Sequence, residues 1–195
     1  MANITAQQLI PLILYGGLLI ILIICTVIDL SHHRIPNQLT CPTLLVALLM
    51  YSLNSGVDGL LFSLSGAAMG FVVFFLPYLM GAVGAGDVKL MTAVGAVLGF
   101  HQTVAALLLI ALAGGGLALG HMLYRGTAKE TFSRMVKMVW LGLTLVVHRD
   151  PSLLQVDKKK LHQDGIPFAV AITAGVYLFF ILLLVNKEIL SVLVG

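Results

Sequence analysis

The sequence predicts an all-α polytopic membrane protein, built as a bundle of about six transmembrane helices. Of its 195 residues, 59% are hydrophobic and only 10% are charged, and the mean hydropathy is +1.06. Soluble domains carry roughly 25% charged residues. The apolar residues also form runs of about 20, the length that crosses a bilayer core of about 30 Å. Because no long linker and no internal repeat interrupts them, we expect one membrane domain over residues 1–195.

Six apolar runs define the expected spans. Four have the length of a full crossing: 9–28, 60–80, 103–124 and 166–185. The runs 39–53 and 88–100 are shorter, so a tilted or re-entrant segment stays open for each of them. Turn-forming residues at 54–56 and 99–102 separate neighbouring runs, as an up-and-down bundle requires. The first run has no Lys or Arg before it and exceeds the apolar core of a secretory signal, which favours a retained span.

The basic residues predict the orientation of this bundle. With six crossings, every Lys and Arg except Lys187 falls on one side of the membrane. Lys and Arg concentrate in cytoplasmic loops, so this side is expected to face the cytoplasm, with both chain termini outside. The net charge of +3 is then explained by a basic rim beside anionic lipid. The lipid bilayer is the expected partner, and nucleic acid is not.

The longest polar connection, 125–165, contains a predicted amphipathic helix. Its apolar residues recur at helical spacing and its charged residues occupy the other side; the apolar set is Phe132, Met135, Val136, Val139, Trp140 and Leu143. This pattern is typical of a helix that lies on the inner leaflet. A helix packed on the bundle with solvated charges is the alternative.

Cysteine and histidine give no indication of a metal or cofactor site. Cys25 and Cys41 form no CxxC pair, the usual signature of a zinc or redox site. His32 and His33 are adjacent, which is poor geometry for joint ligation from a helix. We therefore expect neither a metal nor a cofactor.

Two acidic residues mark the candidate chemistry. Asp29 follows the first expected span, and Asp87 precedes the fourth. Because the chain between them crosses out and back, both carboxyl groups return to the same depth, where ionisable residues are costly and usually functional. A carboxyl pair that shares one proton can hydrolyse an amide, since the ionised member accepts a proton from water while the other donates to the scissile carbonyl. Asp29 and Asp87 are thus the predicted catalytic pair.

The neighbouring glycines fit this interpretation, although simpler alternatives stay open. Gly84 and Gly86 lack a Cβ, so we expect the backbone there to adopt positive φ and to let an extended substrate strand approach closely. Asp87 could instead merely cap the helix beginning at Val88 and bond its free N–H groups. Asp29 could be an interfacial acid paired with Arg34. Other glycines are spaced for close helix packing, namely Gly66 with Gly70 and Gly95 with Gly99.

Two other classes of function compete with hydrolysis. The first is a small proton-coupled transporter, which also needs acids within the membrane. The second is a non-catalytic subunit of an envelope assembly. The acids of a transporter usually lie near the bilayer midplane. Here both acids lie at one boundary beside the basic loops, which favours hydrolysis of an amide over transport.

Two segments carry a resemblance to a known family. The stretches "DLSHHRIPN" (29–37) and "GAGDVKLM" (84–91), separated by two apolar spans, resemble the GxGD membrane aspartyl proteases. Within these proteases the chain resembles the prepilin peptidases, and above all the short CpaA/TadV type associated with tight-adherence (Flp) pili. The later "GIPFAVAITAG" (165–175) is similar to the final span of that family.

The resemblance implies an aspartic endopeptidase of the bacterial cytoplasmic (inner) membrane. Its substrates would be prepilin or pseudopilin precursors, whose short basic leader is removed at the cytoplasmic face, and other pilus assembly components would be further partners. Asp29 and Asp87 match the catalytic aspartates of the family. The residues expected to support the site are Gly84, Gly86, Lys89, Arg34, Pro36 and Asn37.

Bifunctional members of the family also carry a cysteine-bearing insert and an N-methyltransferase activity. This chain has no CxxC pair and no room for that insert between its first two spans. We therefore expect no N-methylation.

Overall fold

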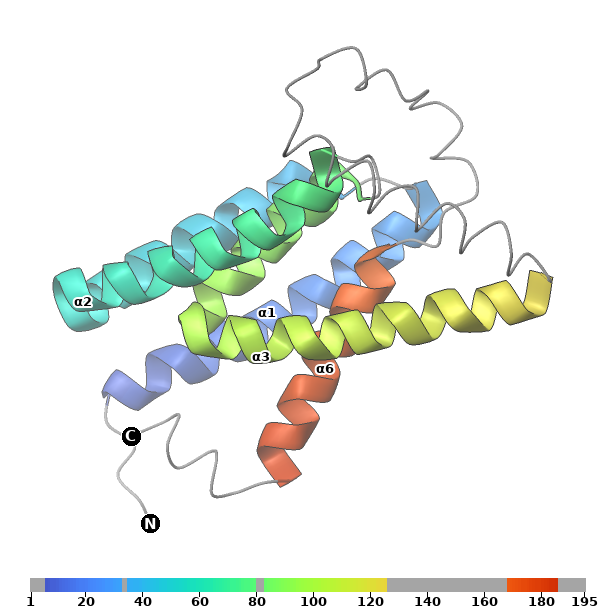
Figure 1. Cartoon of the computed structure of the whole chain (residues 1–195). Coiled ribbons are helices and arrows are strands. Elements are labelled where there is room, and N and C mark those ends of the chain that lie inside the picture. Colours follow the sequence, from blue (N-terminus) through green and yellow to red (C-terminus); the bar gives the residue numbers. More distant parts are fainter. Residues whose placement is uncertain (1–5, 33–34, 80–82, 126–167, 186–195) are drawn as a thin grey trace, which may run out of the picture.

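The protein is all-helical wherever its structure is described. The computed structural model describes residues 6–32, 35–79, 83–125 and 168–185 (Figure 1). The helices in these ranges are α1 (Ala6–His32), α2 (Asn37–Leu79), α3 (Ala85–Arg125) and α6 (Phe168–Val185). All four are long and apolar enough to cross a membrane, where a helix satisfies its backbone hydrogen bonds internally. The predicted class, an all-α membrane protein, is confirmed.

Two of the helices change direction within their length. A straight helix of 43 residues, the length of α2, would extend about 65 Å, roughly twice the thickness of a bilayer core. Ser55 and Gly56 have non-helical backbone angles, and α2 turns back on itself there (Figure 1). In α3 the chain turns at Gly99, whose φ of 73° is one that glycine adopts readily. The predicted breaks are thus confirmed at 55–56 and at Gly99, although the helix resumes at Phe100 instead of after 102.

Helix bounds near the two acids differ from those expected. α1 continues to His32, past the end of the expected span at residue 28, so Asp29 lies in the last turn of this helix, at the end where it was expected. α3 starts at Ala85, so Asp87 belongs to its first turn. The expected amphipathic helix over 125–165 lies outside the described residues, except for Arg125 at the end of α3.

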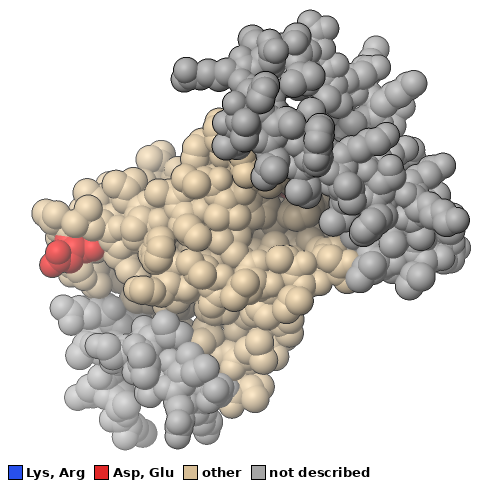
Figure 2. Space-filling view, viewed as in Figure 1, with Lys and Arg blue, Asp and Glu red and all other residues tan. Residues whose placement is uncertain are grey.

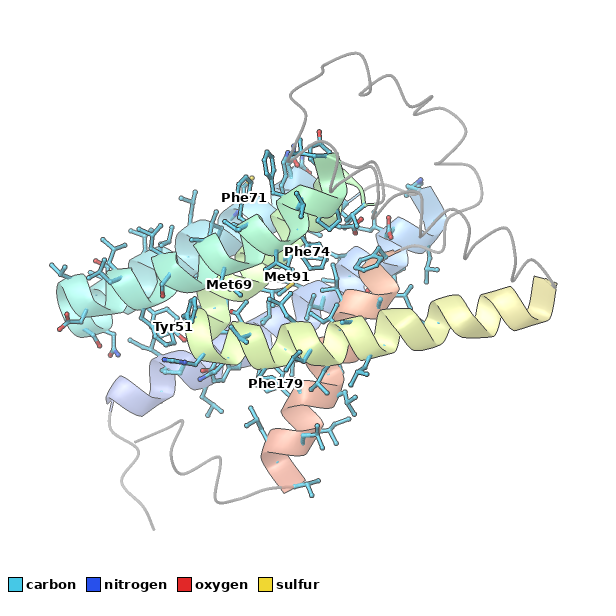
Figure 3. All side chains as sticks on the ribbon, in the orientation of Figure 1. Tyr51, Met69, Phe71, Phe74, Met91 and Phe179 are labelled. Carbon is cyan, nitrogen blue, oxygen red and sulfur yellow. The ribbon has the colours of Figure 1, made fainter. Side chains whose placement is uncertain are left out.

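The first limb of α3 (85–98) is the centre of the bundle. Leu90, Met91 and Val94 are each at most 1% exposed, and Figure 3 shows Met91 near the middle of the molecule. α2 approaches this limb at glycines. A Cβ on Gly66 would meet the backbone of Gly95, and a Cβ on Gly95 would meet that of Gly66. The predicted packing through small residues is confirmed at this contact, because only hydrogen atoms separate the two backbones.

Side-chain hydroxyl groups stabilise the turn at Gly99. The last carbonyl groups of a helix have no partner within it, and in lipid they must still be bonded. Ser63 Oγ donates to the carbonyl of Ala96 at 2.8 Å, and Tyr51 OH donates to that of Val97 at 2.8 Å. Both donors come from α2, so α2 completes the broken end of the α3 limb.

Helix α6 is held between α1 and α3. Tyr177 OH donates to the carbonyl of Leu19 at 3.0 Å, and the hydroxyls of Thr173 and Thr26 lie 2.6 Å apart. On its other side, a Cβ on Gly175 would meet the backbone of Ile110 in α3. α6 therefore braces α1, the helix that carries Asp29.

The glycine contact between α2 and α3 makes a prediction about stability. Gly95→Ala is expected to lower the free energy of unfolding by about 1–3 kcal/mol, because the added methyl group has no space and the helices must separate. Thermal unfolding in detergent measures this. Gly16→Ala is the matched control, since a Cβ there meets nothing within 4 Å and alanine favours a helix. Equal unfolding temperatures for Gly95→Ala and the wild type would contradict the contact.

Candidate active site

The two predicted acids lie together at one end of the bundle. The last turn of α1 carries Asp29 and the first turn of α3 carries Asp87, and these helix ends meet at the end remote from the turn of α2 (Figure 1). Each acid is only 8% exposed. Their carboxyl groups are close enough to interact electrostatically. The structure therefore brings together two side chains that are far apart in the sequence.

A third described acid provides a contrast. Asp58 follows the turn of α2 and is exposed. Among the residues coloured in Figure 2, acidic side chains reach the visible surface only at that end of the molecule. Burial thus distinguishes Asp29 and Asp87 from an acid that is simply solvated.

Asp87 also caps its own helix. Its Oδ2 accepts a hydrogen bond from the N–H of Gly84 at 3.1 Å, and its N–H donates to the carbonyl of Gly84 at 3.1 Å. A carboxyl group at the third helical position commonly reaches back in this way. The alternative that Asp87 caps a helix beginning at Val88 is therefore wrong in its position, because α3 begins at Ala85 and Asp87 bonds back to Gly84 from the third helical position. A carboxylate has about four acceptor positions, so a single bond to Gly84 still allows Asp87 to bind water or substrate.

The glycines before Asp87 act differently from the expectation. Positive φ was expected at Gly84 and Gly86, and this is wrong, because within the described residues positive φ occurs at Gly56 and Gly99. A Cβ on Gly86 would lie 2.9 Å from the Cβ of Ile35. The space beside Gly86 is thus filled by the protein's own chain. The local sequence contains no signal for Ile35, since its role depends on a contact between distant segments.

The connection between α1 and α2 is attached to the start of α3. Lys89 Nζ donates to Asn37 Oδ1 at 2.9 Å, next to the contact between Ile35 and Gly86. Pro36 lies directly before α2, where its carbonyl accepts the N–H of Leu39 at 3.1 Å. Of the expected supporting residues, only Arg34 lies outside the described residues. Gly84, Gly86 and Lys89 lie at the start of α3, Asn37 is bonded to Lys89, and Pro36 comes directly before Asn37.

This arrangement is suited to acid–base chemistry on a peptide. Two carboxyl groups that interact electrostatically, withdrawn from bulk water where the ends of α1 and α3 meet, disfavour the state in which both are ionised, so one can act as an acid and the other as a base. Within the described part of the chain, no group of three or more His, Cys, Asp or Glu side chains is placed to bind a metal ion.

Comparison with known families agrees with this geometry. Residues 17–119, more than half of the chain, match the model of the type IV leader peptidase family. The chain belongs to the type IV leader peptidase family. The matched range includes Asp29, Asp87 and every expected supporting residue, whereas α6 lies beyond it.

Similar leader peptidases occur in several bacteria. A protein of Aeromonas hydrophila named prepilin leader peptidase/N-methyltransferase is 37% identical over 112 residues, which cover 54% of this chain and 38% of the relative. A protein of the same name from Pectobacterium carotovorum subsp. carotovorum is 31% identical over 140 residues, covering 67% of this chain and 49% of the relative. The chain thus spans less than half the length of these curated relatives. No solved structure matches it.

The bond between Asn37 and Lys89 makes a second prediction. Asn37→Ala and Lys89→Ala are each expected to lower the free energy of unfolding by at most about 1 kcal/mol, as is usual for an exposed hydrogen bond. Because each variant removes the same bond, the double variant should lose little more than either single variant. Thermal unfolding of all four proteins measures the coupling.

Lys89→Ala combined with Asp58→Asn is the control for this cycle. Asp58 lies at the opposite end of the bundle, so these two effects should add. Full additivity between Asn37 and Lys89 would show that they do not act as a pair.

Proposed function

We propose that this chain is an aspartic endopeptidase that removes the short basic leader from prepilin or pseudopilin precursors. The observation that carries the proposal is the pair Asp29 and Asp87, buried together where the end of α1 meets the start of α3 in a member of the type IV leader peptidase family. Related proteins named prepilin leader peptidase/N-methyltransferase support the substrate class. The cleavage would take place at the cytoplasmic face of the bacterial inner membrane.

The two carboxyl groups would divide the chemistry between them. The ionised group accepts a proton from a water molecule while the water oxygen attacks the scissile carbonyl carbon. The protonated group donates to the carbonyl oxygen. The tetrahedral intermediate then collapses as the carboxyl group that took the proton from water passes it to the leaving amine, while the other carboxyl group recovers its proton from a hydroxyl of the intermediate. The bond from Gly84 to Asp87 and the bond from Lys89 to Asn37 would maintain the geometry that this exchange needs.

We propose that the chain does not catalyse N-methylation. The connection between α1 and α2 is only four residues, 33–36, which leaves no room there for the cysteine-bearing insert of bifunctional members. No CxxC pair occurs in the chain.

We also propose a topology of six crossings. The two limbs of α2 (37–54 and 57–79) and the two limbs of α3 (85–98 and 100–125) would each cross the membrane, together with α1 and α6. The non-helical residues at the turns support this count. The distribution of Lys and Arg then puts the site at the cytoplasmic face and both termini outside. The amphipathic helix on the inner leaflet stays a prediction.

The competing functions receive less support. A transporter would have its acids near the midplane, whereas Asp29 and Asp87 lie within a turn of their helix ends. Membership of a peptidase family disfavours both a transporter and a purely structural subunit.

Replacing either acid tests the proposed chemistry. In cells that also express pilin precursors from the same genome, Asp29→Asn and Asp87→Asn are each expected to reduce leader removal by about 10²–10⁴-fold, because an amide cannot exchange the proton. Gel mobility or mass of the precursor measures cleavage. The control variant Asp58→Asn, which changes the exposed acid at the other end of the bundle, should remove the leader normally. If Asp29→Asn and Asp87→Asn both insert normally and still remove the leader completely, the two acids are not the catalytic pair.

Cysteine labelling tests the proposed topology. On a background with Cys25→Ser and Cys41→Ser, Ser55→Cys in the turn of α2 is expected to react with a membrane-impermeant maleimide in spheroplasts. Ser31→Cys, near the end of α1, should react only after the membrane is opened. Labelling of both positions from the same side would exclude six crossings with a cytoplasmic site.

A further inference from the structure

Thr40, in the first turns of α2, has a buried hydroxyl with no partner. The residue is 2% exposed, and within the described residues its Oγ1 is the one buried side-chain nitrogen or oxygen atom that lacks a hydrogen bond. Buried hydroxyl groups are normally bonded, since removal from water without a new bond costs free energy. An unpaired hydroxyl inside this bundle therefore requires an explanation.

The other described threonines show how the protein usually satisfies this group. Most of them donate to the carbonyl four residues earlier in their own helix, at 2.6–2.8 Å: Thr26, Thr43, Thr92 and Thr103. Thr173 instead pairs with Thr26. For Thr40 the equivalent carbonyl is that of Pro36, which precedes the helix and accepts the N–H of Leu39. The usual bond is not made at this position.

The face of α2 that carries Thr40 is directed at α3. The first limb of α2 is bonded to α3 at both ends, from Lys89 to Asn37 at 2.9 Å and from Tyr51 to the carbonyl of Val97 at 2.8 Å. Thr40 lies three residues after Asn37, on the same helical face that continues to Tyr51. Thr40 therefore faces α3 about one turn inside the Asn37 bond.

Thr40 also lies at the depth of the two acids. Asp29 is three residues before the end of α1, Thr40 three residues after the start of α2, and Asp87 two residues after the start of α3. A helix rises 1.5 Å per residue, so each side chain begins about 3–5 Å inside its helix end. The three helix ends meet at the candidate active site. Thr43, the next buried hydroxyl on α2, is bonded to its own backbone.

We propose that the Thr40 hydroxyl is a substrate-binding group that hydrogen-bonds the backbone of the precursor beside the scissile peptide bond. This inference rests on the proposed peptidase function. A hydroxyl both donates and accepts, so it can pair with a peptide carbonyl or N–H. An extended peptide that enters this depth needs partners for its backbone, because lipid offers none. A hydroxyl with no bond to the protein can supply one without breaking another.

Two substitutions at Thr40 separate this role from a structural one. Thr40→Val keeps the shape and removes the hydroxyl, and it is expected to lower kcat/KM for leader removal about tenfold, the value of one lost hydrogen bond. Its unfolding temperature should equal or exceed that of the wild type, because no bond within the protein is lost. Thr40→Ser keeps the hydroxyl and should retain activity within about threefold.

Thr43→Val is the matched control on the same helix. Its hydroxyl is buried but bonded to the carbonyl of Leu39, so its removal should leave kcat/KM close to that of the wild type. A tenfold loss in Thr40→Val alone, with Thr40→Ser active, would support the inference.

The results that would contradict the inference can be told apart from those that would contradict the proposed function. Wild-type cleavage by Thr40→Val would overturn the inference while the proposed function stands. A Thr40→Val protein that fails to fold or unfolds at a clearly lower temperature would also overturn it, since the hydroxyl would then serve the structure itself. If the wild type cleaves no precursor from its own genome, the proposed function fails, and the inference fails with it.

Discussion

Close backbone contact between α2 and α3 is the constraint on which the rest of the structure depends. Lipid chains are as apolar as leucine, so helices in a membrane associate through packing and not through expulsion of water. Gly66 and Gly95 allow α2 to lie directly against the first limb of α3, and Gly70 meets the carbonyl of Met91 in the same way. This contact centres α3 in the bundle. Its first turn, with Asp87, can then meet the ends of both α1 and α2.

The two ends of the bundle use polar groups differently. At the turn in α3, hydroxyls from Ser63 and Tyr51 bond carbonyl groups that the helix break exposes, so the polar groups there serve the fold. At the other end Asp87 bonds Gly84 through one oxygen, and the hydroxyl of Thr40 has no partner. Polar groups that can still form further hydrogen bonds in the folded protein are suited to binding a ligand. This difference agrees with a site at the end where Asp29 and Asp87 meet.

The contacts also show how the two separated motifs fit together. Asn37 and Lys89 are 52 residues apart and share a hydrogen bond, while Ile35 fills the space beside Gly86. Each motif thus supplies an acid and a surface that fits the other motif. A larger residue at position 86 would crowd Ile35, since even a Cβ there would lie 2.9 Å from the Cβ of Ile35.

The sequence by itself determined the all-helical membrane class, the breaks near Gly56 and Gly99, and the placement of Asp29 and Asp87 at the same end of the bundle, because composition, turn chemistry and the cost of a charge in lipid are local properties. It wrongly assigned positive φ to Gly84 and Gly86. Only the tertiary structure decided that Ile35 covers Gly86, that Lys89 bonds Asn37 and that Thr40 is buried without a partner. Each of these depends on which distant segment occupies the neighbouring space, and no local pattern encodes that.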